Sequence, residues 1–127
     1  MIYLDTHVLV WIYAGLVEKI CEPVKSMINE HQVFISPMVA LELNYLYEIN
    51  RITVDGGAII SELTRKMDLK ICDRPFQDVV MKACGITWTR DPFDRIITGQ
   101  AALTDTILIT KDELILRHYP MARWESS

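Results

Sequence analysis

The sequence has few cysteines and no pattern among them. Its 127 residues include only three, Cys21, Cys72 and Cys84, which are far apart and form no Cys-x-x-Cys pair. An odd, scattered set does not fit a disulfide framework or the ligand spacing of a zinc site. We therefore expect three thiols that act as small core residues in a protein of the reducing cytoplasm.

No stretch of the chain is apolar for long enough to cross a bilayer. The longest apolar run, residues 8–14, is far shorter than the roughly 20 residues that a membrane helix requires. An apolar patch lies at the start of the chain, but Asp5 and His7 interrupt it and no Lys or Arg precedes it. The patch therefore does not resemble a signal peptide, and we expect no membrane partner.

The sequence also lacks an excess of basic residues. Its 13 Lys and Arg residues are outnumbered by 17 Asp and Glu residues, which gives a net charge of −4. A protein that holds nucleic acid by a broad positive surface is normally basic. This composition disfavours such a surface, but it leaves open a small site at which a metal ion supplies the positive charge.

What is present is the composition of a folded domain. Half of the residues are hydrophobic and 24% are charged, which excludes intrinsic disorder. A chain of 127 residues has the length of one domain, and no repeat or long linker divides it. We therefore expect residues 1–127 to form a single domain.

Short apolar runs alternate with longer helical patterns along the chain. Strands are expected at residues 2–4, 33–35, 69–71, 106–110 and 122–124. Helices are expected at residues 7–14, 17–30 with a break near Pro23, 37–49, 58–67 after a turn at 55–57, 75–84, 92–103 and 113–119. Strands that alternate with helices need crossover connections. The pattern thus predicts an α/β fold with a mostly parallel central sheet of four to five strands and helices on both faces.

Two aspartates follow predicted strands. Asp5 ends the segment MIYLD and Asp112 ends TILITKD. In an open parallel sheet the ligand crevice lies at the carboxyl ends of the strands, so both side chains should point to that edge. Each also has a purely structural interpretation, as the residue that starts a turn or caps the next helix.

Glu42 is more informative because of its place on a helix. At 100° per residue it falls between Ile49 and Leu46, in the middle of an apolar face, whereas Asn44 and Glu48 lie on the opposite side. A carboxylate that faces a core without a partner costs several kcal/mol. Either a buried Arg or Lys pairs with it, or it is protonated, or the face ends at a crevice that binds a cation. We favour the cation.

The segment Asp91-Pro92-Phe93-Asp94 contains two more acids. Asp91 is explained as a helix N-cap followed by proline in the first turn. Asp94 either compensates the helix dipole or is a fourth carboxylate aimed at the crevice. Four converging carboxylates cannot all ionise without a cation. Because the ligands are all oxygens, we expect Mg²⁺ or Mn²⁺, which suits the attack of an activated water on a phosphate ester.

Four segments, LDTHVLVW, LELNYL, DPFDRIITGQAAL and LITKDELI, resemble motifs of the PIN-domain ribonucleases in the order of that family. The likeness runs from Met1 to Tyr119 and is greatest to the VapC-type toxins of bacterial and archaeal toxin–antitoxin pairs. It implies a PIN-like three-layer α/β fold, Mg²⁺-dependent cleavage of single-stranded or structured RNA, a homodimer and a small inhibitory antitoxin.

The resemblance also assigns residues. It places the acidic residues of the family at Asp5, Glu42, Asp94 and Asp112, with Asp91 as an additional acid, and its small hydroxyl residues near the metal at Thr6 and Thr110. The chain departs from the family pattern at Gly99-Gln100, where two small apolar residues are usual. We expect this departure to alter helix packing and not the metal site.

The other polar and aromatic residues carry weaker signals. Arg90, Arg95 and Lys111 flank the acidic motifs and are candidates for contact with RNA, although such residues are more often solvated or paired with acids. His7 is expected to be a half-buried helix residue. The tyrosines and tryptophans are dispersed in the sequence, which predicts no platform for base stacking.

Two other functions remain open at this point. A phosphoryl-transfer domain of the receiver or phosphatase type also places aspartates at strand ends, but a receiver would have an adjacent acid pair after the first strand, where Asp5 is followed by Thr6 and His7. A non-catalytic RNA-binding module on the same fold is the other alternative. The four acids, Glu42 above all, disfavour it.

Overall fold

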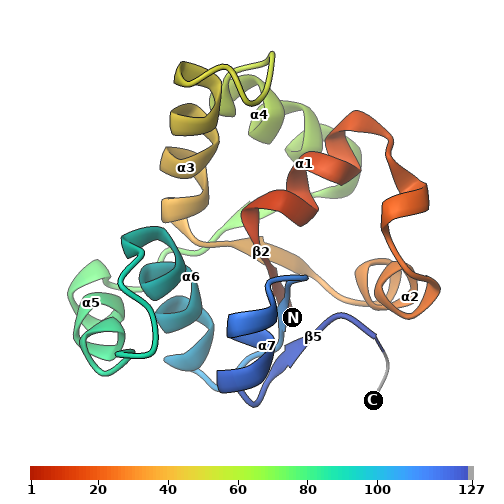
Figure 1. The fold of residues 1–127 in the computed structure, drawn as a ribbon. Coiled ribbons are helices and arrows are strands. Elements are labelled where there is room, and N and C mark those ends of the chain that lie inside the picture. The colour runs from red at the N-terminus through yellow and green to blue at the C-terminus, as the bar shows by residue number, and fades with distance from the viewer. Residues whose placement is uncertain (126–127) are drawn as a thin grey trace.

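A five-stranded sheet in the order β3-β2-β1-β4-β5 organises the protein (Figure 1). The computed structural model describes residues 1–125. The strands are β1 Ile2–Leu4, β2 Val33–Ile35, β3 Lys70–Ile71, β4 Leu108–Ile109 and β5 Ala122–Arg123. Every neighbouring pair is parallel, which confirms the predicted sheet. The carboxyl ends of β1 and β4, the two strands followed by Asp5 and by Asp112, lie side by side.

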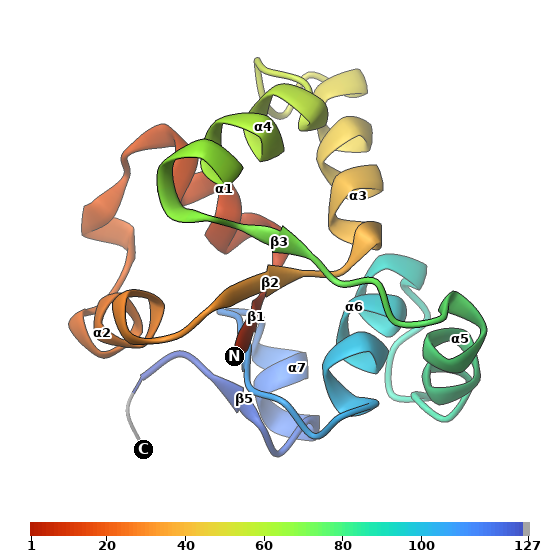
Figure 2. The ribbon, with the colours of Figure 1, turned by 180° about the vertical axis from the view of Figure 1, so that it is seen from behind.

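Helices cover the sheet and connect its strands (Figures 1 and 2). They are α1 Thr6–Ala14, α2 Glu22–Glu30, α3 Pro37–Glu48, α4 Gly56–Met67, α5 Phe76–Cys84, α6 Pro92–Ala102 and α7 Glu113–His118, with a 3₁₀ turn at Val17–Lys19. Helices α1, α3 and α4 pack on one another, and α5 packs along α6. The break expected near Pro23 is real, because α2 begins just before this proline.

Side-chain caps start the helices that carry or adjoin the acidic residues. Asp5, Ser36, Asp91 and Asp112 each accept a hydrogen bond from a backbone N–H in the first turn of α1, α3, α6 and α7. Such a cap stabilises a helix by about 1 kcal/mol. It also fixes the side chain at the start of the helix. Asp5 and Asp112 follow β1 and β4, so their caps place carboxylates at the carboxyl edge of the sheet, whereas Asp91 follows the loop after α5.

Helix α4 begins earlier than the sequence predicted. Asp55 accepts a hydrogen bond from the Ala58 N–H, so Gly56 and Gly57 belong to the first turn of the helix and not to a preceding turn. A Cβ at Gly56 would lie 3.0 Å from both the Ala40 carbonyl oxygen and the Leu43 Cβ. The glycine therefore serves the close approach of α4 to α3.

The uniformly apolar helix α1 is covered within the molecule. Val8 and Leu9 are fully buried, and the residues that follow them pack partly against the core. No helix among residues 1–125 has the length and apolarity needed to cross a membrane.

The cysteines are unpaired, and their placement corrects one expectation. Cys72 is buried and Cys21 half-buried, as expected of small core residues, whereas Cys84 is exposed at the end of α5. The end of a helix on the surface leaves that thiol uncovered.

Gly99, of the pair Gly99-Gln100, lies in the contact between α5 and α6. A Cβ at Gly99 would lie 3.1 Å from the Ala83 Cβ, so a larger residue would require Ala83 to shift by a few tenths of an ångström. The Arg95 guanidinium holds the same contact by donating to the carbonyls of Ala83 and Cys84, at 3.3 Å each from Nη2. Neither Gly99 nor Gln100 lines the acidic pocket described below, in agreement with the expected effect on packing alone.

Candidate metal and active site

Asp5 is the most deeply placed of the acidic residues. It follows β1 and is only 7% exposed. Its Oδ1 accepts the Thr6 N–H at 2.8 Å, and its Oδ2 accepts the Thr110 hydroxyl at 2.6 Å. Burial raises the pKa of this carboxyl, while the two hydrogen bonds act in the opposite direction. Asp5 is thus held in one orientation at the bottom of the site.

Thr110 links two of the acids. Its buried hydroxyl donates to Asp5 and accepts the backbone N–H of Asp112 at 3.0 Å. Asp112 in turn caps α7 by accepting the Ile115 N–H at 2.9 Å. From this one position Asp112 caps α7 and also lines the pocket as a candidate metal ligand.

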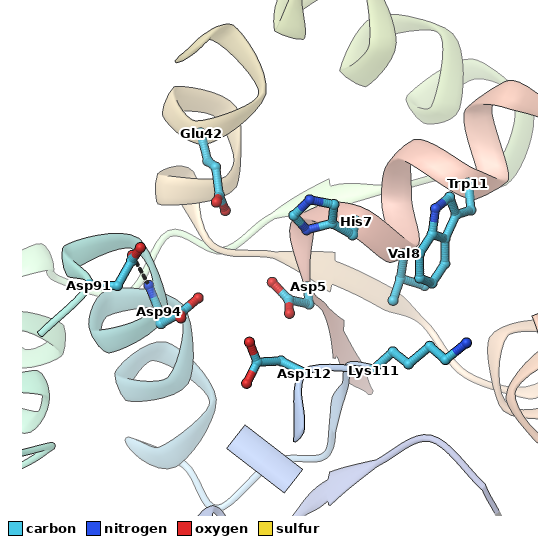
Figure 3. Close-up of a pocket in the computed structure, with 9 residues that line it drawn as sticks. All are labelled: Asp5, His7, Val8, Trp11, Glu42, Asp91, Asp94, Lys111 and Asp112. Atoms are coloured by element: carbon cyan, nitrogen blue, oxygen red, sulfur yellow. Dashed lines mark hydrogen bonds between the residues drawn. The ribbon is translucent and has the colours of Figure 1, made fainter. Parts of the chain in front are cut away.

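Glu42 comes from α3, on the side of the pocket opposite Asp112 (Figure 3). Its Oε1 accepts the Thr6 hydroxyl at 2.5 Å. No Lys or Arg among residues 1–125 forms an ion pair with it. Burial, followed by the negative charge of Asp5, raises the pKa of Glu42. The buried basic partner that would have explained this residue structurally is therefore absent from the described chain.

Asp91 and Asp94 approach from the start of α6. Asp91 accepts the Asp94 N–H at 3.0 Å, which confirms its role as N-cap. Burial, and then the negative charges of Asp91, Asp5, Asp112 and Glu42, raise the pKa of Asp94 to about 7. This carboxyl therefore experiences the field of all the others.

Together these acids line one pocket of about 410 Å³. Figure 3 shows the carboxylates of Asp5, Glu42, Asp94 and Asp112 directed toward a common space, with Asp91 at its edge. His7, Val8, Trp11 and Lys111 complete the lining. The convergence predicted from strand ends and from the helical wheel is thus what the fold produces.

The donor set fits a hard divalent cation. All candidate ligands are carboxylate oxygens, and burial together with repulsion among them raises the pKa values of Glu42 and Asp94. Within residues 1–125 no three His, Cys, Asp or Glu side chains are already gathered around a single ion position. Mg²⁺ tolerates this arrangement because it keeps several waters and commonly contacts only one or two carboxylates directly.

Three lining residues, His7, Val8 and Trp11, were not predicted as site residues. His7, expected to be half-buried, is exposed and faces the pocket (Figure 3). Trp11 lies one helical turn further along α1 and also lines it. Residues 7 and 11 are four positions apart and therefore lie on one face of a helix. Because this helix begins directly after Asp5, their spacing was the available signal that both lie near the site.

Two of the three basic candidates lie elsewhere. Arg95 is occupied by the carbonyls at the end of α5, and Arg90 donates to the Thr87 carbonyl at 3.0 Å. Both line a separate hollow and not the acidic pocket. Contact of these two arginines with RNA stays a prediction, whereas Lys111 does lie at the pocket.

Comparison with known proteins identifies the family. The model of the PIN domain matches residues 2–119 of the chain. The chain belongs to the PIN domain family. This match confirms the resemblance seen in the sequence motifs, and the parallel sheet with its covering helices is the PIN-like fold expected from them.

Solved structures show the same fold. VapBC2 from Rickettsia felis, bound to a promoter DNA fragment, is similar with a TM-score of 0.66 and 17% identity, covering 98% of this chain and 100% of that one. A toxin–antitoxin complex from Klebsiella pneumoniae has a TM-score of 0.68 and 17% identity, with 97% and 96% covered. DNA-bound VapBC from Salmonella typhimurium has a TM-score of 0.65 and 18% identity, with 98% of both chains covered. No curated protein matches the chain.

The acidic pocket contains the residues that the resemblance to the PIN domain family assigned. The four residues that the resemblance assigned as acids, Asp5, Glu42, Asp94 and Asp112, all line the pocket. The two assigned hydroxyl residues, Thr6 and Thr110, lie behind it and bind Glu42 and Asp5.

Proposed function

We propose that this PIN-domain chain is a Mg²⁺- or Mn²⁺-dependent endoribonuclease and the toxin of a toxin–antitoxin pair that acts in the cytoplasm. The observation that carries the proposal is a pocket lined by five carboxylates, none of which forms an ion pair with a described Lys or Arg. The five carboxylates are therefore not neutralised by a basic partner, and a divalent cation would supply the missing positive charge. The family match and the toxin–antitoxin structures of the same fold support this function.

In this proposal Asp5, Glu42, Asp94 and Asp112 hold the cation. When bound, a divalent ion lowers the pKa of a water molecule and neutralises charge on a phosphate ester, which promotes hydrolysis. Thr110 keeps Asp5 in its orientation, and Thr6 does the same for Glu42. Asp91 positions Asp94 by fixing the first turn of α6.

The test is cleavage of RNA and DNA panels by purified protein with Mg²⁺, Mn²⁺, Zn²⁺ or EDTA. We expect RNA to be cut with Mg²⁺ or Mn²⁺, and cleavage to stop with EDTA and in Asp5→Asn. Asp78→Asn is the matched control, since Asp78 is an exposed acid remote from the pocket. Cleavage that EDTA leaves intact, or that zinc alone restores, contradicts the metal assignment. RNA binding without cleavage under any of these conditions favours the non-catalytic module.

A small antitoxin and a second copy of the chain are the proposed protein partners. The similar solved structures are a toxin–antitoxin complex and two DNA-bound VapBC complexes, which supports an antitoxin as partner. For the homodimer the support is on α3, where Leu41 is 58% and Tyr45 46% exposed, with Tyr45 packed on Phe93 at 5.6 Å between ring centroids. Exposed apolar groups of this size usually mark an association surface. Sedimentation that shows only monomer at micromolar concentration contradicts the homodimer.

A further inference from the structure

An aromatic and basic cluster borders the acidic pocket on the side of α1. Trp11 and Trp124 are 113 residues apart in the sequence, yet their rings meet edge-to-face with centroids 5.8 Å apart. The Lys111 ammonium lies 6.0 Å from the Trp11 ring centroid and 5.8 Å from that of Trp124, and the Lys19 ammonium lies 5.6 Å from the Trp11 centroid. The aromatic residues are dispersed in the sequence, and the fold brings these two together.

The charge of Lys111 is not neutralised by an acidic partner within the described chain. Asp112 and Glu113 follow it directly, but no ion pair among residues 1–125 includes Lys111. Figure 3 shows its side chain extended away from the carboxylates and along the Trp11 side of the pocket. An ammonium held over indole rings keeps its charge and stays accessible to an anion. Lys111 is exposed, in agreement with this.

Lys111 also stands between two hollows. It lines the acidic pocket together with Trp11, and it lines a second hollow of about 410 Å³ together with Arg123 and Trp124. A chain of phosphates that enters the acidic pocket meets five carboxylates, which repel it at any position that a metal ion does not neutralise. At the rim of that pocket, by contrast, the lining contains the ammonium group of Lys111, which attracts a phosphate.

We propose that Trp11 and Lys111 form a subsite for one nucleotide beside the scissile phosphate, with the base packed on the Trp11 indole and the phosphate held by Lys111. The proposal rests on the proposed ribonuclease function and adds a requirement on the substrate. A base can stack on a protein ring only when it is free of its own duplex, so the nucleotide at this position must be unpaired. The subsite therefore engages one unpaired nucleotide next to the cut.

Trp124 acts as a positioning residue in this arrangement. It is buried, and its backbone carbonyl accepts the Cys21 thiol at 2.9 Å. Its edge-to-face contact holds the half-buried Trp11 ring in place. Edge-to-face pairs of this kind add about 0.5–1.5 kcal/mol beyond the area they bury.

The experiment uses an RNA that the parent protein cleaves, with its cut site mapped. Each of the three nucleotides on either side of the cut is replaced in turn by an abasic ribose, and kcat and KM are measured for the parent and for Trp11→Leu. Stacking of a base on an aromatic side chain is worth about 1–3 kcal/mol, or roughly 5- to 150-fold. We expect one abasic position to raise KM by this factor in the parent and to have no further effect in Trp11→Leu, with kcat nearly unchanged.

Lys111→Met tests the phosphate contact separately and does not disturb the core. We expect KM to rise about tenfold and the dependence of log kcat/KM on log salt to become shallower by about 1, the value for one phosphate contact. Lys111→Arg should keep most of the affinity. The matched controls are Lys82→Met, an exposed lysine on α5, and Trp88→Leu, a half-buried tryptophan stacked on His118 outside the pocket.

The outcomes separate this inference from the proposed function. If the parent cuts RNA but the effects of Trp11→Leu and of every abasic position are additive, the subsite is wrong and the ribonuclease function stands. The same holds if Lys111→Met behaves like Lys82→Met. If Trp11→Leu fails to fold, Trp11→Phe in the same abasic series and Lys111→Met decide the question. If the parent cuts no RNA, the proposed function and the subsite fall together.

Discussion

Asp94→Asn should stabilise the metal-free protein at pH 8 while it abolishes cleavage. The pKa of Asp94 is raised from its ordinary value of 3.8 to about 7, first by burial and then by four neighbouring carboxylates. An acid whose pKa is higher in the folded state contributes stability below its unfolded pKa and loses that contribution as the pH rises through the folded value. The parent should therefore lose stability between about pH 4 and pH 7. Asparagine removes the charge at nearly constant volume.

The magnitude follows from the size of the shift and from what opposes it. A shift of about three pKa units corresponds to roughly 4 kcal/mol if the full field acts. The pocket is open to solvent, which screens part of that field. The first-turn acid also interacts favourably with the helix dipole, by about 0.3–1 kcal/mol, and asparagine loses this. We expect a net gain of about 2 kcal/mol at pH 8, or roughly 6–10 °C in Tm for a chain of this size.

The assay is thermal unfolding of EDTA-treated parent and Asp94→Asn at pH 5 and pH 8, followed by repetition with Mg²⁺. Asp78→Asn is the control, because Asp78 holds the same third position in α5 that Asp94 holds in α6 but lies outside the acidic pocket. It should lose the dipole interaction alone and melt slightly lower. The gain of Asp94→Asn should shrink at pH 5, and Mg²⁺ should stabilise the parent more than the variant. A metal-free Asp94→Asn that melts no higher than the parent at pH 8 refutes the reasoning.

Three further predictions address other parts of the molecule. Thr110→Val leaves the Asp112 N–H and Asp5 without their shared hydroxyl, so chemical denaturation should show a loss of about 1–3 kcal/mol and RNA cleavage should fall. Gly56→Ala places a Cβ 3.0 Å from backbone and side-chain atoms of α3, which should cost about 1–3 kcal/mol in the same assay and leave the metal dependence of cleavage unchanged. Leu41→Glu puts a charge on the exposed face of α3, and sedimentation should show a monomer with cleavage or Mg²⁺-induced stabilisation retained; an unchanged dimer contradicts the interface.

Much of the site could be predicted from local sequence because its parts are local. Asp5 and Asp112 follow apolar runs that become β1 and β4, and the parallel arrangement brings strand ends to one edge. Glu42 was identified by the 100° periodicity of α3, which requires nothing beyond the helix itself. The Asp91-Pro92 pair specifies the start of α6 in the same way.

Other features depended on how segments that are distant in the sequence pack against one another. The local sequence did not show that Gly56 of α4 would face Ala40, or that Gly99 of α6 would face Ala83. The absence of a Cβ matters only where another residue packs closely against that position. Likewise, the sequence placed Arg95 beside the acids along the chain, whereas its guanidinium turns to the carbonyls that end α5. Side-chain direction is decided by the partner that the fold supplies.

By itself the sequence determined the alternation of strands and helices, the caps at the strand-to-helix junctions, and a surplus of carboxylates on faces that ought to be apolar. These are set by short-range periodicity and capping, which involve residues within a few positions of one another. Only the tertiary structure decided that Trp11, Lys111 and Trp124 meet beside the acidic pocket, and that Thr110 hydrogen-bonds Asp5 across 105 residues. Such contacts arise from the pairing of β1 with β4 and of β4 with β5, and long-range pairing leaves no local trace in the sequence.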